Sequence, residues 1–389
     1  MPVTGSVLAA LRLAAATGYA PQAQEKWLVA CRQVDWAALV QAAADAGISS
    51  LLYQAVQTLP ETCAPPAARQ MLHARYLQVG LLNAYLLPQF AAVVQALSGV
   101  GIEPVVLKGA ALAAAVYDNV ALRPMSDLDL LIPFRDLLAA QSCLATLNFA
   151  PPAPLPFANE SGLFWNQQLW QRTIWQPISV ELHWALLDIP YYARRWSATE
   201  LRQRSRRILL EGITTWALAV EDQLLHLCAH NFYHHLGQLA QVGPDIGYFL
   251  RQCQPDWDLL LAQAARCHLG LAVKQTLLAA FDQWHVPVDP AIRIAVEKLP
   301  THPYEIWFQR CQRHELLKVA RTAFTLPGGK LRLRYVWKQF FPERAYLLWR
   351  YGLPADATTR RAYLTRIRSR LPKGKTAFAS TTAKVSGGS

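Results

Sequence analysis

Residues 105–109 are Val-Val-Leu-Lys-Gly, and residues 125–132 are Met-Ser-Asp-Leu-Asp-Leu-Leu-Ile. The first stretch predicts a strand that ends at a glycine, and the second predicts a strand that carries two carboxylates. Because strand side chains alternate between faces, Asp127 and Asp129 share one face, roughly 7 Å apart. Two such carboxylates repel each other unless a cation lies between them, which suits one or two Mg²⁺ ions. The alternative is a solvated edge strand with Asp127 as a capping residue, but the apolar flanks favour a buried strand.

A second polar pattern lies at residues 178–184, Ile-Ser-Val-Glu-Leu-His-Trp. Strand alternation places Glu181 and His183 on one face, with the apolar residues on the other. Glu181 taken alone is typical of a solvated strand residue. Three roles for His183 stay open: a hydrogen bond near Glu181, polarisation of a phosphate, or capping of the sheet.

The motifs Leu107-Lys108-Gly109, Tyr117, Arg123 and Ser126–Leu131 resemble the uncharacterised nucleotidyltransferase family of the DNA polymerase β-like superfamily. The resemblance implies an α+β fold in which a small mixed sheet is embedded in a largely helical chain. It also implies a glycine motif that opens a helix, a carboxylate pair on the next strand and a third acid on a later strand. The chain departs from the usual pattern in one place, because Gly109 is followed by alanine and not by serine or glycine.

The resemblance assigns roles to the residues of these motifs. Catalysis and the binding of Mg²⁺ or Mn²⁺ fall to three acids, Asp127, Asp129 and Glu181, the last being followed by the family's Leu-His-Trp. Binding of the phosphates of an NTP such as ATP is assigned to residues in and near the glycine motif: Lys108, Gly109, Arg123 and Ser126. The alternative for Lys108 is a solvated strand-end lysine, and that for Arg123 is a loop salt bridge to Asp118 or Asp127.

Histidines recur at four-residue steps in the predicted helix that begins near Glu221: His226, His230 and His234. Two histidines at this spacing can share a zinc ion. The helix lacks the glutamate of a metalloprotease motif and an evident third ligand. The resembled family has a similar helical histidine followed by an Asp-Ile pair, which favours a structural or substrate-lining role for His230 and Asp245.

Composition limits the class of protein. The chain has 389 residues, of which 53% are hydrophobic, and a formal net charge of +12, which indicates a folded chain of two or three domains. No window of eighteen uninterrupted apolar residues occurs, so we expect no transmembrane segment. Seven scattered cysteines without a Cys-x-x-Cys motif are typical of free thiols in a reducing cytoplasm.

We expect four regions along the chain. They are a helical region (1–100), a catalytic core (101–190), a second helical region (191–371) and a disordered tail (372–389). Between residues 330 and 375 there are thirteen Lys or Arg side chains against Glu343 and Asp356, a net charge of +11. This segment is either a solvated helical surface or a surface for an anionic partner such as nucleic acid.

The predicted activity is the transfer of a nucleoside monophosphate from an NTP to a hydroxyl group. The acceptor stays open between a small molecule, a sugar, a protein and an RNA. Two alternatives stand beside this function. One is a catalytically degenerate protein that binds a nucleotide or a partner, and the other is an enzyme that modifies RNA ends.

Overall fold

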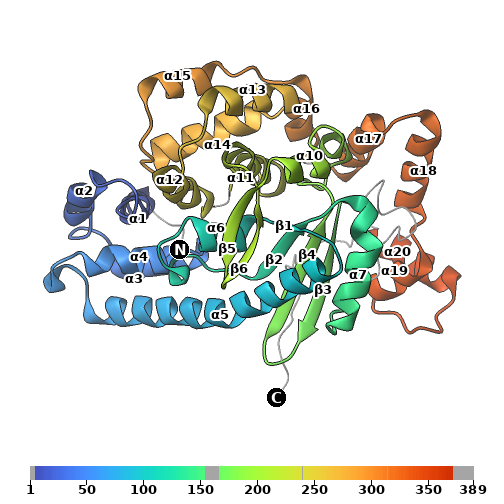
Figure 1. Ribbon diagram of the computed structural model, residues 1–389, viewed down its shortest axis with the longest axis horizontal. Helices are drawn as coiled ribbons and strands as arrows, with labels where there is room; N and C mark the ends of the chain where they lie inside the picture. Colours follow the sequence, from blue (N-terminus) through green and yellow to red (C-terminus); the bar gives the residue numbers. More distant parts are fainter. Residues whose placement is uncertain (1–4, 154–165, 239, 313, 371–389) are drawn as a thin grey trace. The chain divides into compact units, whose positions relative to one another are not determined.

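The computed structural model describes residues 5–153, 166–238, 240–312 and 314–370. The expected disordered tail, 372–389, lies outside these residues. At the centre is one six-stranded sheet with the order β3-β4-β2-β1-β6-β5 (Figure 1). Its strands are β1 (Val105–Val106), β2 (Asp127–Leu131), β3 (Gln167–Thr173), β4 (Pro177–His183), β5 (Arg206–Leu210) and β6 (Ile213–Ala217).

The sheet is mixed, which confirms the α+β prediction. β2 pairs in parallel with β4, and β1 pairs antiparallel with β2 and in parallel with β6. β3–β4 and β5–β6 are antiparallel hairpins. The register of the parallel pair places Asp129 directly opposite Glu181. The two strands that carry the predicted acids are therefore neighbours.

Strands β5 and β6 differ from the helical structure expected beyond residue 191. Ile208 and Leu210 are buried while Arg207 and Leu209 are exposed, so the segment follows the two-residue period of a strand. The connecting residues, Glu211 and Gly212, have φ angles of 46° and 78°. Two successive positive φ angles are typical of a tight hairpin turn, and this two-residue turn is the signal that sequence reasoning missed.

Helices cover both faces of the sheet. On one face lie α5 (Pro66–Gly99) and α7 (Leu137–Thr146), which share a core with the apolar side chains of β2 and β4. On the other lie α11 (Val220–His234) and α12 (Val242–Gln252), while α6 (Lys108–Ala115) follows β1 and contributes Ala110, Ala111 and Ala113 to the core that contains α5. Leu128 and Leu130 point into the α5 core and are fully buried. Alternation therefore turns Asp127 and Asp129 toward α11.

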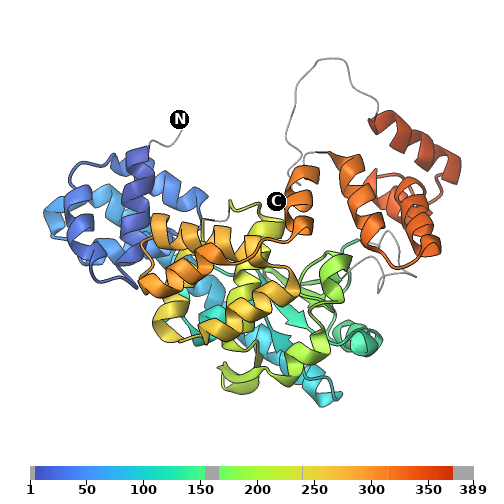
Figure 2. The ribbon, with the colours of Figure 1, turned by 90° about the horizontal axis from the view of Figure 1, so that it is seen from above.

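The N-terminal helices form one group, which Figure 2 shows in blue at one end of this part of the chain. The group comprises α1 (Gly5–Ala16), α2 (Ala23–Ala30), α3 (Trp36–Asp45) and α4 (Ser49–Gln57). Asp35 caps α3, because its side chain accepts hydrogen bonds from the amides of Ala37 and Ala38. These helices pack on the N-terminal half of α5 and share a core with α11 and α12.

Helix α5 is long and apolar enough to cross a bilayer, judged by length and composition alone. Of its most apolar 18-residue window, 39% is buried within the protein. Leu86, Phe90 and Leu97 face the sheet and are fully buried. Met71 and Leu81 face outward and are 58% and 73% exposed. The absence of a transmembrane segment therefore stays a prediction.

Most of the remaining chain is helical, as expected. The helices are α9 (Pro190–Ala193), α10 (Ala198–Gln203), α13 (Trp257–Cys267), α14 (Gly270–Gln283), α15 (Pro290–Lys298), α16 (Pro303–Cys311) and α17 (Glu315–Thr325). All seven cysteines are free, as predicted, and five of them are buried. The four predicted regions stay a prediction, and contacts group the described residues within 5–152 and 166–336 into one compact unit.

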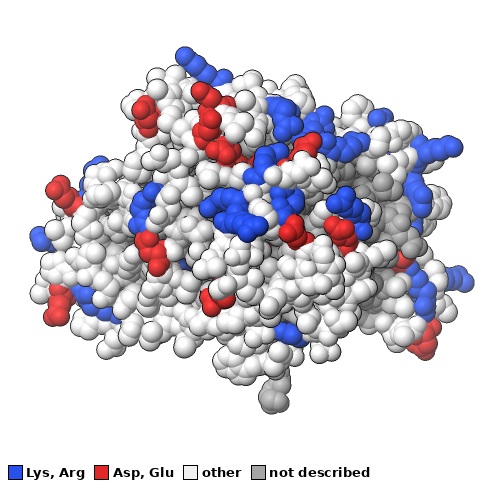
Figure 3. Space-filling model, viewed as in Figure 1, with Lys and Arg blue, Asp and Glu red and all other residues white. Residues whose placement is uncertain are grey.

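The described residues of the second unit are 153 and 337–370. It includes α19 (Arg344–Arg350), α20 (Thr359–Arg370) and the end of α18 (Gly329–Phe340). Some of its basic side chains have structural partners, because Arg344 donates to the carbonyls of Ala355 and Ala357 and Arg366 donates to that of Gln339. Figure 3 shows that Lys and Arg side chains also gather where β5, β6 and α10 lie. The anionic partner of residues 330–375 stays a prediction.

Candidate active site

A cavity of about 510 Å³ lies on the face of the sheet that carries the acids. Strands β2 and β4 form one wall, and α6, α11 and α12 form the others. The predicted site residues that line it are Lys108, Gly109, Arg123, Ser126, Asp127, Asp129, Glu181, His230 and Asp245. His183 lies directly behind two of them. The motifs, which are more than a hundred residues apart in sequence, therefore meet in one cavity.

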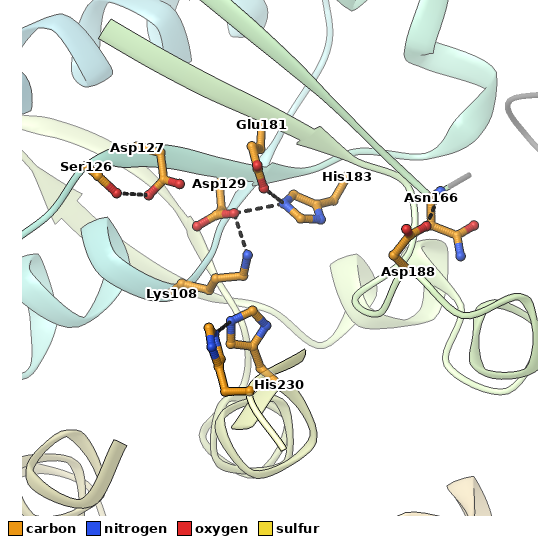
Figure 4. A network of polar contacts seen from close by, with 10 residues as sticks. Lys108, Ser126, Asp127, Asp129, Asn166, Glu181, His183, Asp188 and His230 are labelled. Carbon is orange, nitrogen blue, oxygen red and sulfur yellow. Dashed lines mark hydrogen bonds and ion pairs between the residues drawn. The ribbon is translucent and has the colours of Figure 1, made fainter. Parts of the chain in front are cut away.

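Asp129 is the most buried of the three predicted catalytic acids, with only 2% of the residue exposed. Its Oδ1 atom lies 2.7 Å from the Lys108 ammonium and 2.8 Å from His183 Nε2 (Figure 4). Burial raises the pKa of a carboxyl group, but the two cationic partners outweigh it and hold the pKa of Asp129 well below its usual range. Asp129 is thus a carboxylate at neutral pH.

His183 connects the acids of the two neighbouring strands. Its Nε2 atom also lies 3.3 Å from Glu181 Oε2. Burial and Lys108 lower the pKa of His183, while the hydrogen bonds to Asp129 and Glu181 raise it, and the net effect is a raised pKa. Of the three roles left open for His183, the hydrogen bond near Glu181 is the one that the structure contains.

Within the described residues, Asp129, Glu181 and His183 form a group that could hold a metal ion. One ligand atom from each lies within 4.8 Å of the other two. Two carboxylates and one imidazole are donors that a divalent cation accepts, and Mn²⁺ tolerates this mixture better than Mg²⁺ does. The sequence predicts that Asp127 and Asp129 share the metal. In the structure, the candidate ligand group instead joins Asp129 on β2 to Glu181 on the neighbouring strand β4.

Asp127 lies beside this group, and the negative charge of Asp129 affects its pKa. Burial, followed by the negative charge of Asp129, raises the pKa of Asp127 to about 6. The Ser126 hydroxyl donates to Asp127 Oδ1 at 3.1 Å. A raised pKa on one acid and a lowered pKa on its neighbour are the expected result of like charges that share one site. A bound cation would relieve the repulsion, as the two-residue spacing predicts.

Lys108 and Gly109 open α6 beneath the acids. Lys108 has a φ of 43°, which is unusual for a residue other than glycine and turns the chain from β1 into the helix. A Cβ atom on Gly109 would lie 2.9 Å from Arg123 Nη1, so the glycine allows the guanidinium to pack against the backbone. Lys108 forms an ion pair with Asp129, so the alternative of a solvated lysine at the end of the strand is wrong.

Arg123 forms a buried ion pair that sequence reasoning did not foresee. Its Nε and Nη2 atoms donate to the two carboxylate oxygens of Asp245 at 2.9 and 3.0 Å. The Tyr117 hydroxyl donates to the same carboxylate at 2.7 Å. The alternative of a loop salt bridge to Asp118 or Asp127 is therefore wrong in its partner, since Asp245 comes from α12, about 120 residues later. Arg123 and Asp245 fix the floor of the cavity.

The wall opposite the acids consists of imidazoles. His226, His230 and His234 follow one face of α11, as their spacing predicts, and His235 joins them at the end of the helix. Figure 4 shows His230 projecting from α11 toward Lys108. The positions of Gln167, Gln241 and His235 in the cavity were missed, because nothing in the local sequence distinguishes them from other loop or strand residues.

Acids on two adjacent parallel strands face the beginning of a glycine-containing helix, which is the arrangement that the resemblance implies. A family model of uncharacterised nucleotidyltransferases matches residues 32–284, which is more than half of the 389 residues. The chain belongs to this family, as its motifs predict. No curated protein matches the chain at a significant level.

Proposed function

We propose that the chain is a metal-dependent enzyme that moves a nucleoside monophosphate from an NTP to a hydroxyl group of an acceptor. One observation supports this proposal above the others. Asp129, Glu181 and His183 approach one another within 4.8 Å, beside a cavity that Asp127 and the first residues of α6 also line. Membership of the family supports nucleotidyl transfer in general.

The donor set fits a hard divalent cation. Asp129 and Glu181 would hold Mg²⁺ or Mn²⁺ through carboxylate oxygens, with Asp127 beside them, and the ion would neutralise charge on the triphosphate. Asp127 accepts only one hydrogen bond among the described residues, from Ser126, so its remaining oxygen lone pairs are available to a ligand.

The chain's own positive groups face the same space. The Lys108 ammonium lies at the cavity wall and is 19% exposed, so it can reach a phosphate oxygen by turning away from Asp129. The first backbone amides of α6 have no side-chain cap, and such amides bind phosphate oxygens. Arg123 contributes less directly, because its guanidinium is held by Asp245. These groups would orient the triphosphate against the acids.

The transfer itself is an in-line displacement. The acceptor oxygen forms a bond to the α-phosphorus, the bond from that phosphorus to the bridging oxygen breaks, and pyrophosphate leaves. The hydroxyl proton goes to Glu181, whose side chain is 21% exposed and therefore accessible from the cavity. His183, which contacts both Glu181 and Asp129, orients the carboxylate that accepts the proton.

Transfer of label tests this function. Purified protein is incubated with each α-labelled NTP, Mn²⁺ or Mg²⁺, and fractions of a cell lysate that contain small molecules, proteins or RNA. We expect metal-dependent labelling in one class of acceptor. Glu181→Gln should weaken nucleotide binding less than it lowers the rate of transfer, which should fall by about 10² to 10⁴, the usual contribution of a general base. Labelling at the wild-type rate in Glu181→Gln would contradict its role as the base.

A further inference from the structure

Another cavity, of about 520 Å³, lies where α9, α16 and α17 meet, within the larger compact unit. Its lining combines aromatic rings with guanidinium groups: Tyr191, Tyr304, Trp307, Phe324, Arg194 and Arg195. None of the described residues that line it is acidic. Its chemistry therefore differs from that of the acid-lined cavity, where carboxylates face a candidate metal site.

Two of these rings form an open corner. The ring centres of Trp307 and Phe324 are 5.7 Å apart, and their planes are inclined by 90°. Phe324 is 66% exposed, so its ring has surface that a ligand can cover. A flat aromatic ligand that stacks on Phe324 would meet Trp307 at right angles, and aromatic pairs prefer these two arrangements. The corner therefore suits a flat ring.

Positive charge surrounds the corner. Arg194, Arg195 and Arg332 each donate to a backbone carbonyl oxygen, and none of them has a carboxylate partner among the described residues. The Arg332 guanidinium carbon lies 5.4 Å from the centre of the Phe324 ring, and that of Arg195 lies 3.7 Å from the centre of the Tyr191 ring. A carbonyl carries no net charge, so these guanidinium groups remain able to attract phosphate.

His302 adds a neutral donor at the same cavity. Burial, followed by the positive charge of Arg195, lowers the pKa of His302, so its ring is neutral at pH 7. Its Nδ1 atom accepts a hydrogen bond from the Tyr304 amide at 3.1 Å, which places the ring proton on Nε2. Glu305 does not offset the charge here, because it is fully buried and accepts hydrogen bonds from backbone amides. The cavity is thus positive, with a further donor.

We propose that this cavity binds one nucleotide of a single-stranded nucleic acid. The base would stack on Phe324 in the corner with Trp307, and neighbouring phosphates would pair with Arg194 and Arg332. Aromatic rings combined with cationic side chains are typical of proteins that bind single strands without sequence preference. Aromatic cavities also accept organic cations, but the guanidinium groups would repel such a ligand.

The openness of the cavity favours a strand over a free mononucleotide. Phe324 and Arg194 are exposed, and Arg332 extends the positive charge beyond the residues that line the cavity. Small ligands are usually enclosed over most of their surface, whereas a strand must enter and leave its site. The proposal rests on these contacts alone and does not depend on nucleotidyl transfer at the acid-lined cavity.

Fluorescence anisotropy of a labelled oligouridylate of about ten nucleotides tests the proposal with the full chain. A chelator keeps divalent metal away from the acids. We expect saturable binding that Phe324→Ala weakens about tenfold or more and that Phe324→Tyr, which keeps the ring, leaves unchanged. Leu316→Ala is the matched control, because Leu316 is 72% exposed on the same helix, and it should bind as wild type does.

Salt dependence provides a second test that needs no change to an aromatic residue. Arg194→Gln should reduce the slope of log K against log salt concentration by about 0.7, the value for one phosphate contact to a single strand. The side chain of Arg194 is exposed, so this variant still tests the proposal if Phe324→Ala fails to fold. An unchanged slope would overturn the phosphate contact.

Three further outcomes would overturn the site. Wild-type affinity in Phe324→Ala would show that no base stacks there. An equal loss in Leu316→Ala would show that the apolar face of α17, and not the aromatic corner, makes the contact. Uridine monophosphate should compete about a hundredfold or more weakly than the strand, and equal affinity would show a mononucleotide site instead.

Discussion

The Lys108 ammonium and the Asp129 carboxylate form a 2.7 Å ion pair at the base of the acid-lined cavity. Lys108 adopts its left-handed backbone conformation at the end of β1, and Asp129 lies in the middle of β2, the neighbouring strand. In the absence of nucleotide, the pair neutralises the most buried of the three predicted catalytic acids. It also holds a flexible cation at the place where the triphosphate is proposed to bind.

Replacing each of the two aspartates of β2 by asparagine should change the free energy of unfolding in opposite directions. Asp129→Asn leaves the buried His183 and Lys108 without their carboxylate, so the free energy of unfolding should fall by about 3–5 kcal/mol. Asp127→Asn removes a carboxylate that burial and Asp129 disfavour, so stability without metal should rise by about 1 kcal/mol. Denaturant unfolding at pH 7.5 in the presence of a chelator measures both changes. Equal losses in the two variants would show that Asp127 is also paired in the fold.

The benefit of Asp127→Asn should depend on pH. The folded protein keeps the Asp127 proton up to a pKa of about 6, while the unfolded chain releases it near 3.8. The favourable contribution of this group is therefore complete below pH 3.8 and is lost as the pH rises through 6. Asp127→Asn has no proton to lose at this position, so its stability does not fall in this way. The difference in the free energy of unfolding between the variant and wild type should therefore grow from pH 4 to about 6.5 and then stay constant. Paired melting curves across this range measure it, and an advantage that does not change with pH would contradict the raised pKa.

The ion pair between Arg123 and Asp245 should be essential for stability. Both side chains are almost fully buried, at 10% and 2% exposure. Asp245→Asn should therefore lower the free energy of unfolding by about 3–5 kcal/mol, because it leaves a buried guanidinium unpaired. The matched control is Asp118→Asn, which breaks the more exposed pair with Arg251 and should change stability by at most about 1 kcal/mol. Similar effects of the two changes would show that Arg123 finds another partner.

Sequence reasoning predicted the acids better than it predicted their partners. Alternation along two strands is a local property, so the shared faces of Asp127 with Asp129 and of Glu181 with His183 follow from spacing alone. The register that sets Asp129 opposite Glu181, and the contact from Arg123 to Asp245, depend on how distant elements pack. No local pattern encodes such pairings. The β5–β6 hairpin was missed for a different reason, because its Glu-Gly turn is a local signal that went unrecognised.

Calorimetric titration of Mg²⁺–NTP or Mn²⁺–NTP into wild type and Asp127→Asn tests the central claim most directly. Asp127→Asn is the suitable variant, because it is expected to fold at least as well as wild type. We expect wild type to bind at least one of the four NTPs with a Kd below about 1 mM, to lose this binding in a chelator, and Asp127→Asn to bind about tenfold or more weakly. Equal affinity in the two proteins, or no binding of any NTP by wild type, would contradict a metal–nucleotide site at Asp127, Asp129 and Glu181.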